Sequence, residues 1–210
     1  MPNAFGTFTP LLTRRIPDDI ALRAYTPTDR GACLAIYADN EAENKPGRIP
    51  PGFRSQFAQT LDRPDYLKLV LCRGDRAAAV GAIARFPRSM SFAYVWLAFG
   101  LVHPTLHGQG LGTALMLARL ASLPEPVEPT RVVLSNTISS EGFVKRFGFE
   151  YQGKEGTRPG GDVFDVRAAV LTVEAWRRCR EIIADVGIAL EQLPEVPVMD
   201  LDVQTVPQDG

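Results

Sequence analysis

The chain has 210 residues, enough for one domain with extensions, and its composition of 45% hydrophobic and 22% charged residues is ordinary for a globular protein. A formal net charge of −1 at pH 7 excludes the strongly basic balance of a nucleic-acid or membrane-surface binder, so we expect neither partner. The charge is uneven, because residues 181–210 hold seven acidic residues and no Lys or Arg, which leaves residues 1–180 with a net charge of +6. An anion-binding domain would carry such an excess, although a solvated surface with an acidic tail is the commoner explanation.

The first half of the chain predicts one strand, two helices and a hairpin. Residues 1–19 show no period and are expected to form an arm that packs on the domain or is disordered. Alternation predicts a strand at 20–25, and helical spacing predicts a helix at 26–40 with Thr26 or Thr28 as its N-cap. A loop rich in Pro and Gly then leads to a short helix that begins at Phe53 and ends before Pro64. Strand-like segments at 66–73 and 77–86 flank the turn residues Gly74 and Asp75.

The second half begins with residues 91–102, which are apolar almost throughout and predict a central strand buried on both faces. The remaining elements are read from the same signals: a helix at 113–122, a strand at 131–135, a helix at 139–147, a strand pair at 149–153 and 162–171, and an amphipathic helix at 172–193. This order predicts an α+β fold with a mixed sheet flanked by helices. We expect an arm at 1–19, a single domain at 20–193 and an acidic, flexible tail at 194–210.

The three cysteines, Cys33, Cys72 and Cys179, are odd in number and have no CxxC spacing. They are expected to be reduced and buried, as in a cytosolic protein. The N-terminus lacks a basic segment followed by an apolar one, and no apolar run approaches the roughly 20 residues of a membrane span. We therefore expect a cytoplasmic location.

Three glycines at alternate positions stand directly before a helix in "LVHPTLHGQGLGTALMLARLA", residues 101–121. Backbone N–H groups at a helix N-terminus are unpaired, and a phosphate can accept them if no β-carbon keeps it away. Gly112 is followed by Thr113 and not by Lys, which excludes a P-loop, and the spacing Gly-x-Gly-x-Gly excludes the dinucleotide fingerprint. A tight turn without any ligand is the alternative.

Val102-His103-Pro104 followed by His107-Gly108-Gln109-Gly110-Leu111-Gly112 resembles the acetyl-CoA loop of the GNAT superfamily of N-acyltransferases. That family has a strand ending in Val-x-Pro, then Arg/Gln-x-x-Gly-x-Gly/Ala opening a helix, so His107 replaces the usual Arg or Gln. The segments at 20–37, 74–86 and 131–153, the last with Gly148-Phe149, resemble other parts of the family in matching order. The resemblance covers residues 20 to 172.

The resemblance implies a central mixed sheet of six to seven strands, with the fourth and fifth strands splayed around the pantetheine arm of acetyl-CoA (coenzyme A). Leu101 and Val102 would bind the pantetheine amides, and residues 107–113 the pyrophosphate. Asn136 resembles an asparagine that contacts the cofactor in the family. The full set of predicted cofactor-binding residues is Leu101, Val102, His103, His107, Gly108, Gln109, Gly110, Leu111, Gly112, Thr113, Asn136 and Phe143.

The catalytic residues depart from the family. The tyrosine that serves as general acid would stand four residues before Gly148, where this chain has Val144. The strand at 91–102 has no Asp or Glu, which leaves Tyr94 and His103 as candidates for proton transfer. His103 and His107 have the i, i+4 spacing of a metal site on a helix, but Pro104 argues against a helix there, and we expect no metal.

Two functions follow from these residues. The first is an N-acetyltransferase that transfers an acetyl group from acetyl-CoA to the primary amine of an unidentified small molecule or protein. The second is a non-catalytic module that binds acyl-CoA as a sensor or partner domain, which the missing tyrosine keeps open. The long C-terminal helix could form a homodimer contact.

Overall fold

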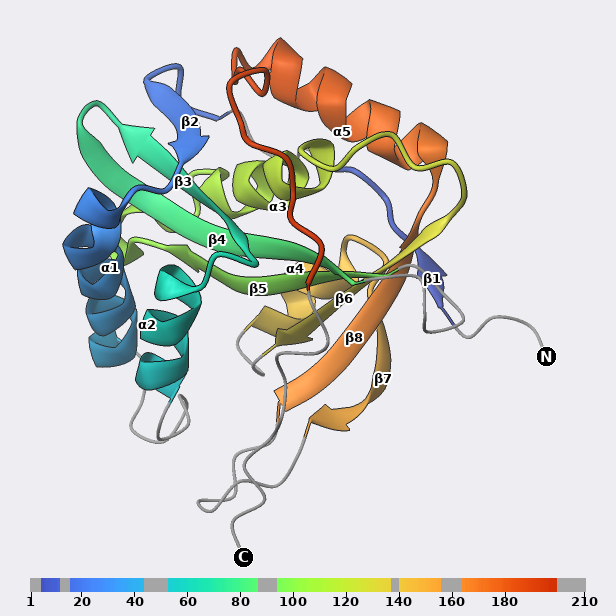
Figure 1. Cartoon of the computed structure of the whole chain (residues 1–210), viewed down its shortest axis with the longest axis horizontal. Coiled ribbons are helices and arrows are strands. Elements are labelled where there is room, and N and C mark those ends of the chain that lie inside the picture. The colour runs from blue at the N-terminus through green and yellow to red at the C-terminus, as the bar shows by residue number, and fades with distance from the viewer. Residues whose placement is uncertain are drawn as a thin grey trace, which may run out of the picture.

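The computed structural model describes residues 5–11, 16–43, 53–86, 94–136, 140–155 and 164–199. Within them, one mixed sheet of eight strands has the order β1-β8-β6-β5-β4-β3-β2, with β7 pairing to β8 (Figure 1). The strands are β1 (Gly6–Thr7), β2 (Ile20–Ala24), β3 (Leu67–Arg73), β4 (Arg76–Phe86), β5 (Tyr94–Val102), β6 (Thr130–Asn136), β7 (Glu150–Glu155) and β8 (Phe164–Leu171). β2 to β5 form an antiparallel meander, β5 and β6 are parallel, and β8 is antiparallel to both β6 and β7. The predicted mixed sheet is confirmed.

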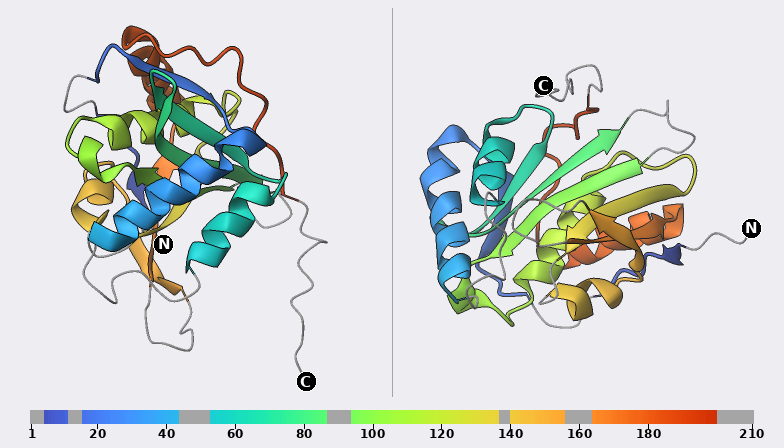
Figure 2. Two further views of the ribbon diagram at one scale, coloured as in Figure 1. Left: turned by 90° about the vertical axis from the view of Figure 1, so that its left-hand side faces the viewer. Right: turned by 90° about the horizontal axis from the view of Figure 1, so that it is seen from below.

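Helices cover both faces of this sheet (Figures 1 and 2). They are α1 (Arg30–Glu43), α2 (Phe53–Asp62), α3 (Leu111–Ala121), α4 (Glu141–Lys145) and α5 (Val173–Asp185), with short 3-10 helices at η1 (Pro27–Asp29) and η2 (Pro104–Leu106). Thr26, one of the two predicted N-caps, precedes η1, and its backbone N–H donates to the Asp29 carboxylate at 2.8 Å.

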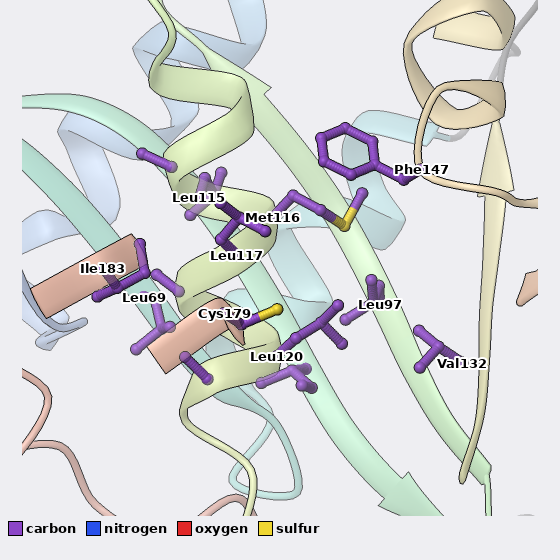
Figure 3. Close-up of a cluster of buried hydrophobic side chains, with 14 of the residues drawn as sticks. Leu69, Leu97, Leu115, Met116, Leu117, Leu120, Val132, Phe147, Cys179 and Ile183 are labelled. Carbon is purple, nitrogen blue, oxygen red and sulfur yellow. The ribbon is translucent and has the colours of Figure 1, made fainter. Parts of the chain in front are cut away.

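Alternation along the strands divides the apolar residues between two cores. On β3, Leu69 and Leu71 pack in the larger core under α3 and α5, whereas Val70 and Cys72 pack in the smaller core under α1 and α2. α3 lies between the sheet and α5, so every residue from Thr113 to Ala121 is buried. Figure 3 shows side chains of the larger core, among them Leu69, Leu97, Leu115, Met116, Leu117, Leu120, Val132, Phe147, Cys179 and Ile183.

Both ends of the described chain pack on the domain, which for the N-terminal arm is one of the two predicted alternatives. β1 comes from the expected N-terminal arm and pairs in parallel with β8, which adds a strand to the six or seven expected. Phe8 follows it and stacks on Phe147 with ring centroids 5.7 Å apart. At the other end, Val196 and Met199 are buried and the Met199 N–H donates to the Arg85 carbonyl at 2.7 Å. The prediction of a flexible tail is therefore wrong for residues 194–199, while residues 200–210 lie outside the described residues.

Two predicted helices have different ends in the structure. The helix expected at 172–193 is α5, which ends at Asp185, because Gly187 takes a φ of +75° that stops the helix. The helix expected to begin at Thr113 begins two residues earlier, at Leu111. Within the described residues, none of the helices combines the length and the apolar character needed to cross a membrane.

Candidate functional site

A gap opens between the two parallel strands at the centre of the sheet. The pairing of β5 with β6 runs from Tyr94–Arg131 to Leu97–Leu134 and stops there, although β5 continues to Val102. When the short β1 is set aside, these are the fourth and fifth strands of the sheet. The prediction that they splay apart is confirmed, and the gap closes at Leu97.

A β-bulge on β5 lies where the strands separate. Ala82 of β4 pairs with Ala98, but the next residue of β4, Gly81, pairs with Gly100, so Phe99 is the extra residue, with a φ of +40°. A bulge bends its strand and shifts the alternation of side chains by one residue. Beyond it, Leu101 packs on the α1 and α2 side, and Gly100 is exposed. The strand is therefore not buried on both faces over its whole length, as the sequence suggested.

The backbone of Val102 faces this gap. The His103 N–H donates to the Ala78 carbonyl of β4 at 2.8 Å, and polar backbone groups alternate in direction along a strand, so those of Val102 and Gly100 point away from β4. The Val102 carbonyl accepts hydrogen bonds from Asn40 Nδ2 and from His107 Nε2, each at 2.9 Å. Of the two residues predicted to bind pantetheine amides, Val102 borders the gap with its backbone, whereas the backbone of Leu101 faces β4.

The glycine loop ends in the N-terminus of α3. Gly108 and Gly110 have φ values of +77° and +86°, which side chains disfavour, and Gly110 is the N-cap without a side-chain capping bond. The first intrahelical bond runs from the Ala114 N–H to the Gly110 carbonyl at 3.0 Å. The N–H groups of the first helical turn, residues 111–113, therefore have no carbonyl partner in the helix, and no acidic residue occupies that turn. This geometry suits a phosphate.

The structure brings the loop and α4 together at the mouth of the gap. A β-carbon at Gly112 would lie 3.7 Å from the ring of Phe143 and 3.8 Å from the Val102 side chain. Gln109 lies on the loop, and its Nε2 reaches the Thr105 carbonyl at 3.5 Å. Val144, the next residue on α4, is only 4% exposed and belongs to the larger core. The position where an acid was expected is therefore a core position that faces away from solvent.

Both histidines are held by the chain itself. His103 Nδ1 accepts the Thr105 hydroxyl at 2.9 Å and the Thr105 N–H at 3.3 Å, and its Nε2 lies 3.3 Å from the Asp39 carboxylate. His103 therefore caps η2 with one ring nitrogen and faces Asp39 with the other. His107 Nε2 must carry a proton, because a carbonyl oxygen can only accept. In the parts of the chain that are described, no cluster of three or more His, Cys, Asp or Glu side chains could hold a metal ion.

Two further predicted residues lie away from the glycine loop. Tyr94 begins β5 at the closed end of the gap, roughly 16 Å from Phe99 at the usual rise per residue, and its ring stacks on Phe86 at 4.2 Å. Burial raises the pKa of Tyr94. Asn136 ends β6, and its Oδ1 accepts a hydrogen bond from Arg167 Nε at 2.8 Å. Arg167 also pairs with Glu141 of α4 at 2.9 Å, so this network ties β6 to α4.

The sequence did not identify Asn40 as part of the site. Its Nδ2 donates to the Ile36 carbonyl of its own helix at 2.8 Å as well as to Val102, so it joins α1 to the edge of the gap. A buried Asn at the end of a helix carries no specific signal in one sequence, because local capping explains it equally well.

Comparisons with known proteins agree with this architecture. The family model of the acetyltransferase (GNAT) domain matches residues 34–168. Among solved structures, a GNAT-family acetyltransferase from Desulfovibrio desulfuricans, described as putative, is 18% identical with a TM-score of 0.54, and covers 73% of this chain and 99% of its own. The N-acyl amino acid synthase FeeM from uncultured soil microbes is 17% identical with a TM-score of 0.56, covering 79% and 97%.

A third similar structure, an aminoglycoside N(6')-acetyltransferase from Legionella pneumophila, is 13% identical with a TM-score of 0.54 and covers 76% of this chain and 95% of its own. At these identities the structures show a shared fold only. No curated protein matches the sequence. The family model spans more than half of the chain, and the splayed strands and the glycine loop lie within the matched residues. The chain belongs to the GNAT acetyltransferase family.

Proposed function

We propose that this protein is an N-acetyltransferase that transfers an acetyl group from acetyl-CoA to a primary amine of a small molecule or a protein. The observation that carries the proposal is the gap between β5 and β6, which leads from the N-terminus of α3 to the bulge at Phe99. The unpaired N–H groups of residues 111–113 would bind the pyrophosphate, and the backbone of Val102 and Gly100 would bind the pantetheine arm. The thioester end would then reach the bulge, since the gap closes at Leu97.

Acetyl-CoA supplies an activated acetyl group, and the chain supplies its orientation. The amine nitrogen forms a bond to the thioester carbon, the carbon–sulfur bond breaks with its electron pair on sulfur, and the amine loses a proton to solvent. Backbone N–H groups of β5 at the bulge would polarise the thioester carbonyl, which is the role of an oxyanion hole. A thiolate is a tolerable leaving group near neutral pH, so the reaction does not require an acid at Val144.

A non-catalytic acyl-CoA-binding module is the second candidate. Val144 is buried, Tyr94 lies at the closed end of the gap, and both ring nitrogens of His103 have partners. Neither Tyr94 nor His103, the two residues that the sequence suggested for proton transfer, is part of the bulge at Phe99. Such a site could bind acyl-CoA without turnover.

Calorimetric titration with acetyl-CoA tests the feature that both candidates share, and we expect saturable binding. Release of CoA thiol is then measured with a panel of amines that includes a polyamine, an aminoglycoside, free amino acids and a peptide with a free N-terminus. Release that depends on one amine supports the transferase. Binding without release from any amine favours the module, and no binding contradicts both.

A further inference from the structure

A buried guanidinium lies beneath the bulge. Arg119 of α3 is 4% exposed and sits among the apolar residues of the larger core. Its Nη1 reaches the carbonyls of Ala82 and Ala98 at 3.4 Å each, and its Nε reaches the Leu115 carbonyl at 3.4 Å. These are long hydrogen bonds. In the described part of the chain no carboxylate pairs with Arg119, and the groups that contact it are uncharged.

Two facing glycines make the space that this guanidinium fills. Gly81 of β4 and Gly100 of β5 pair directly beside the bulge, and both face α3. A β-carbon at Gly81 would lie 3.2 Å from Arg119 Cδ and Nε, and one at Gly100 would lie 3.1 Å from Nη2. Side chains at these two positions would displace the guanidinium. The space for Arg119 is therefore built into two strands, and Nη2 lies directly against Gly100 at the gap.

A buried guanidinium that pairs with no described carboxylate destabilises the folded state, so stability by itself does not explain why an arginine stands at position 119. Removing a cation from water is costly unless a partner compensates, and among the described residues only neutral carbonyls and Met116 Sδ, 4.0 Å from Nη2, contact the guanidinium. Burial lowers the pKa of Arg119 to about 10, which still leaves it charged at neutral pH. An apolar side chain such as Met would fill the same space without this penalty.

The positive charge of Arg119 becomes favourable if negative charge develops in the gap between β5 and β6. We propose that Arg119 is a positioning residue of the acyl-transfer site: it holds the carbonyls of the cross-strand pair Ala82 and Ala98 next to the bulge, and its charge stabilises the CoA thiolate that leaves beside Gly100. This inference rests on the proposed function. It explains how the reaction proceeds with Val144 in the acid position, because a fixed positive charge favours the thiolate and removes the need for a proton donor.

Ultraviolet absorbance of the thiolate, recorded as CoA bound to the protein is titrated with base, measures this effect without any amine. We expect the pKa of the bound CoA thiol to lie below that of an ordinary thiol, which is about 8.5. In Arg119→Met it should rise by about one unit, and in Arg119→Lys, which keeps the charge, it should stay low. Burial raises the pKa of all three cysteines, to about 12 for Cys33 and Cys179, and the same titration of the protein without CoA gives the background to be subtracted.

The matched control is Arg177→Met, which removes an equal charge from the exposed surface of α5 and should leave the pKa of the bound thiol unchanged. An equal pKa in the wild type and in Arg119→Met would overturn the role of Arg119 while leaving the proposed function intact. If Arg119→Met does not fold, an ordinary pKa for the thiol bound to the wild type overturns it as well. Failure of the wild type to bind CoA would contradict the proposed function itself.

Discussion

Two pairs of glycines stand at the two ends of the gap, and they are glycines for different reasons. At Gly108 and Gly110 the backbone has positive φ values, which glycine adopts more readily than any other residue. Gly81 and Gly100 leave room for the side chain of Arg119. The first pair exposes backbone N–H groups at a helix N-terminus, and the second admits a guanidinium, so both ends of the gap become positive. Under the proposed function, the two features serve one chemical requirement, a place for negative charge, which the backbone would supply at one end and a side chain at the other.

The largest effect on stability is expected at the bulge. In Gly81→Ala, the new β-carbon would lie 3.0 Å from the Phe99 carbonyl oxygen and 3.2 Å from Arg119, in a place where the backbone cannot easily move. We expect the free energy of unfolding to fall by about 2 kcal/mol, as for other overpacked cores. Chemical denaturation measures it. Gly31→Ala on α1 is the control, since a β-carbon there meets nothing within 4 Å.

The same substitution in an Arg119→Ala background tests whether Arg119 is the reason for the glycine. Without the guanidinium, Gly81→Ala should cost measurably less, and the double-mutant cycle should give a coupling energy of about 1 kcal/mol. Simple additivity would show that the Phe99 carbonyl alone requires glycine at this position.

The difference between the two ends also explains what the sequence could predict. The glycine loop is continuous in the chain, so its glycines, the Val-x-Pro strand before it and the helix after it are read together, and they led to the family and to the splayed strands. The site of Arg119 is assembled from residues 81, 100 and 119, which meet only when β4, β5 and α3 pack. Its one local sign is a single charged residue within the apolar run of α3.

The bulge could not be predicted from the sequence either, because one extra residue in a uniformly apolar strand does not alter the hydrophobic pattern of that strand. Strict alternation assigns Leu97 and Leu101 to one face, whereas the bulge at Phe99 places them on opposite faces. The C-terminal end was misjudged, and the strand within the N-terminal arm was not predicted, for a related reason. Short segments such as Gly6–Thr7 and the strand-like contact of Val198 with Arg85 gain order from partners far along the chain.

A smaller effect is expected at the other end of the gap. Gly110→Ala places a side chain at a φ of +86° and should lower the free energy of unfolding by about 1 kcal/mol. It should also weaken CoA binding about tenfold, because the loop can no longer present its N–H groups closely to a phosphate. Denaturation and calorimetry measure the two effects.

Gly112→Ala is the matched control, two residues away. Gly112 is helical, and a β-carbon there makes only ordinary contacts, so alanine should stabilise the helix by about 0.5 kcal/mol and leave binding almost unchanged. Equal losses at both positions would mean that backbone conformation does not distinguish these two glycines.

His107 tests how far the backbone alone forms the phosphate site. Its Nε2–H already donates to the Val102 carbonyl, and the side chain is exposed, so His107→Ala should lower stability by about 0.5 kcal/mol. CoA affinity should then fall by less than about threefold. A larger loss in calorimetry would instead support the sequence-based prediction that His107 binds the pyrophosphate, and would require its ring to leave Val102. His107→Gln, which restores a residue common in the family and a donor, separates the loss of a hydrogen bond from the loss of the ring.

The smallest expected effect is the absence of alkylation at the three cysteines of the folded protein. The titration of the bound CoA thiol depends on this result, because a reactive protein thiol would titrate in the same pH range. Cys33, Cys72 and Cys179 are buried, and desolvation raises the pKa of each thiol. A thiol with a pKa of about 12 is ionised to about one part in ten thousand at pH 8, and only the thiolate reacts with alkylating agents. Mass spectrometry after treatment with iodoacetamide at about pH 8 should therefore find no label on the folded protein and all three cysteines labelled after unfolding.

The same pKa shifts fix the direction in which stability changes with pH. Because the thiol pKa values are raised in the native state, the native state binds more protons than the unfolded state above about pH 8.5. These thiols therefore lower the free energy of unfolding as the pH rises. A label on the folded protein would place a protein thiolate in the window where the CoA thiol titrates. The role of Arg119 would then have to be measured in a variant without that cysteine.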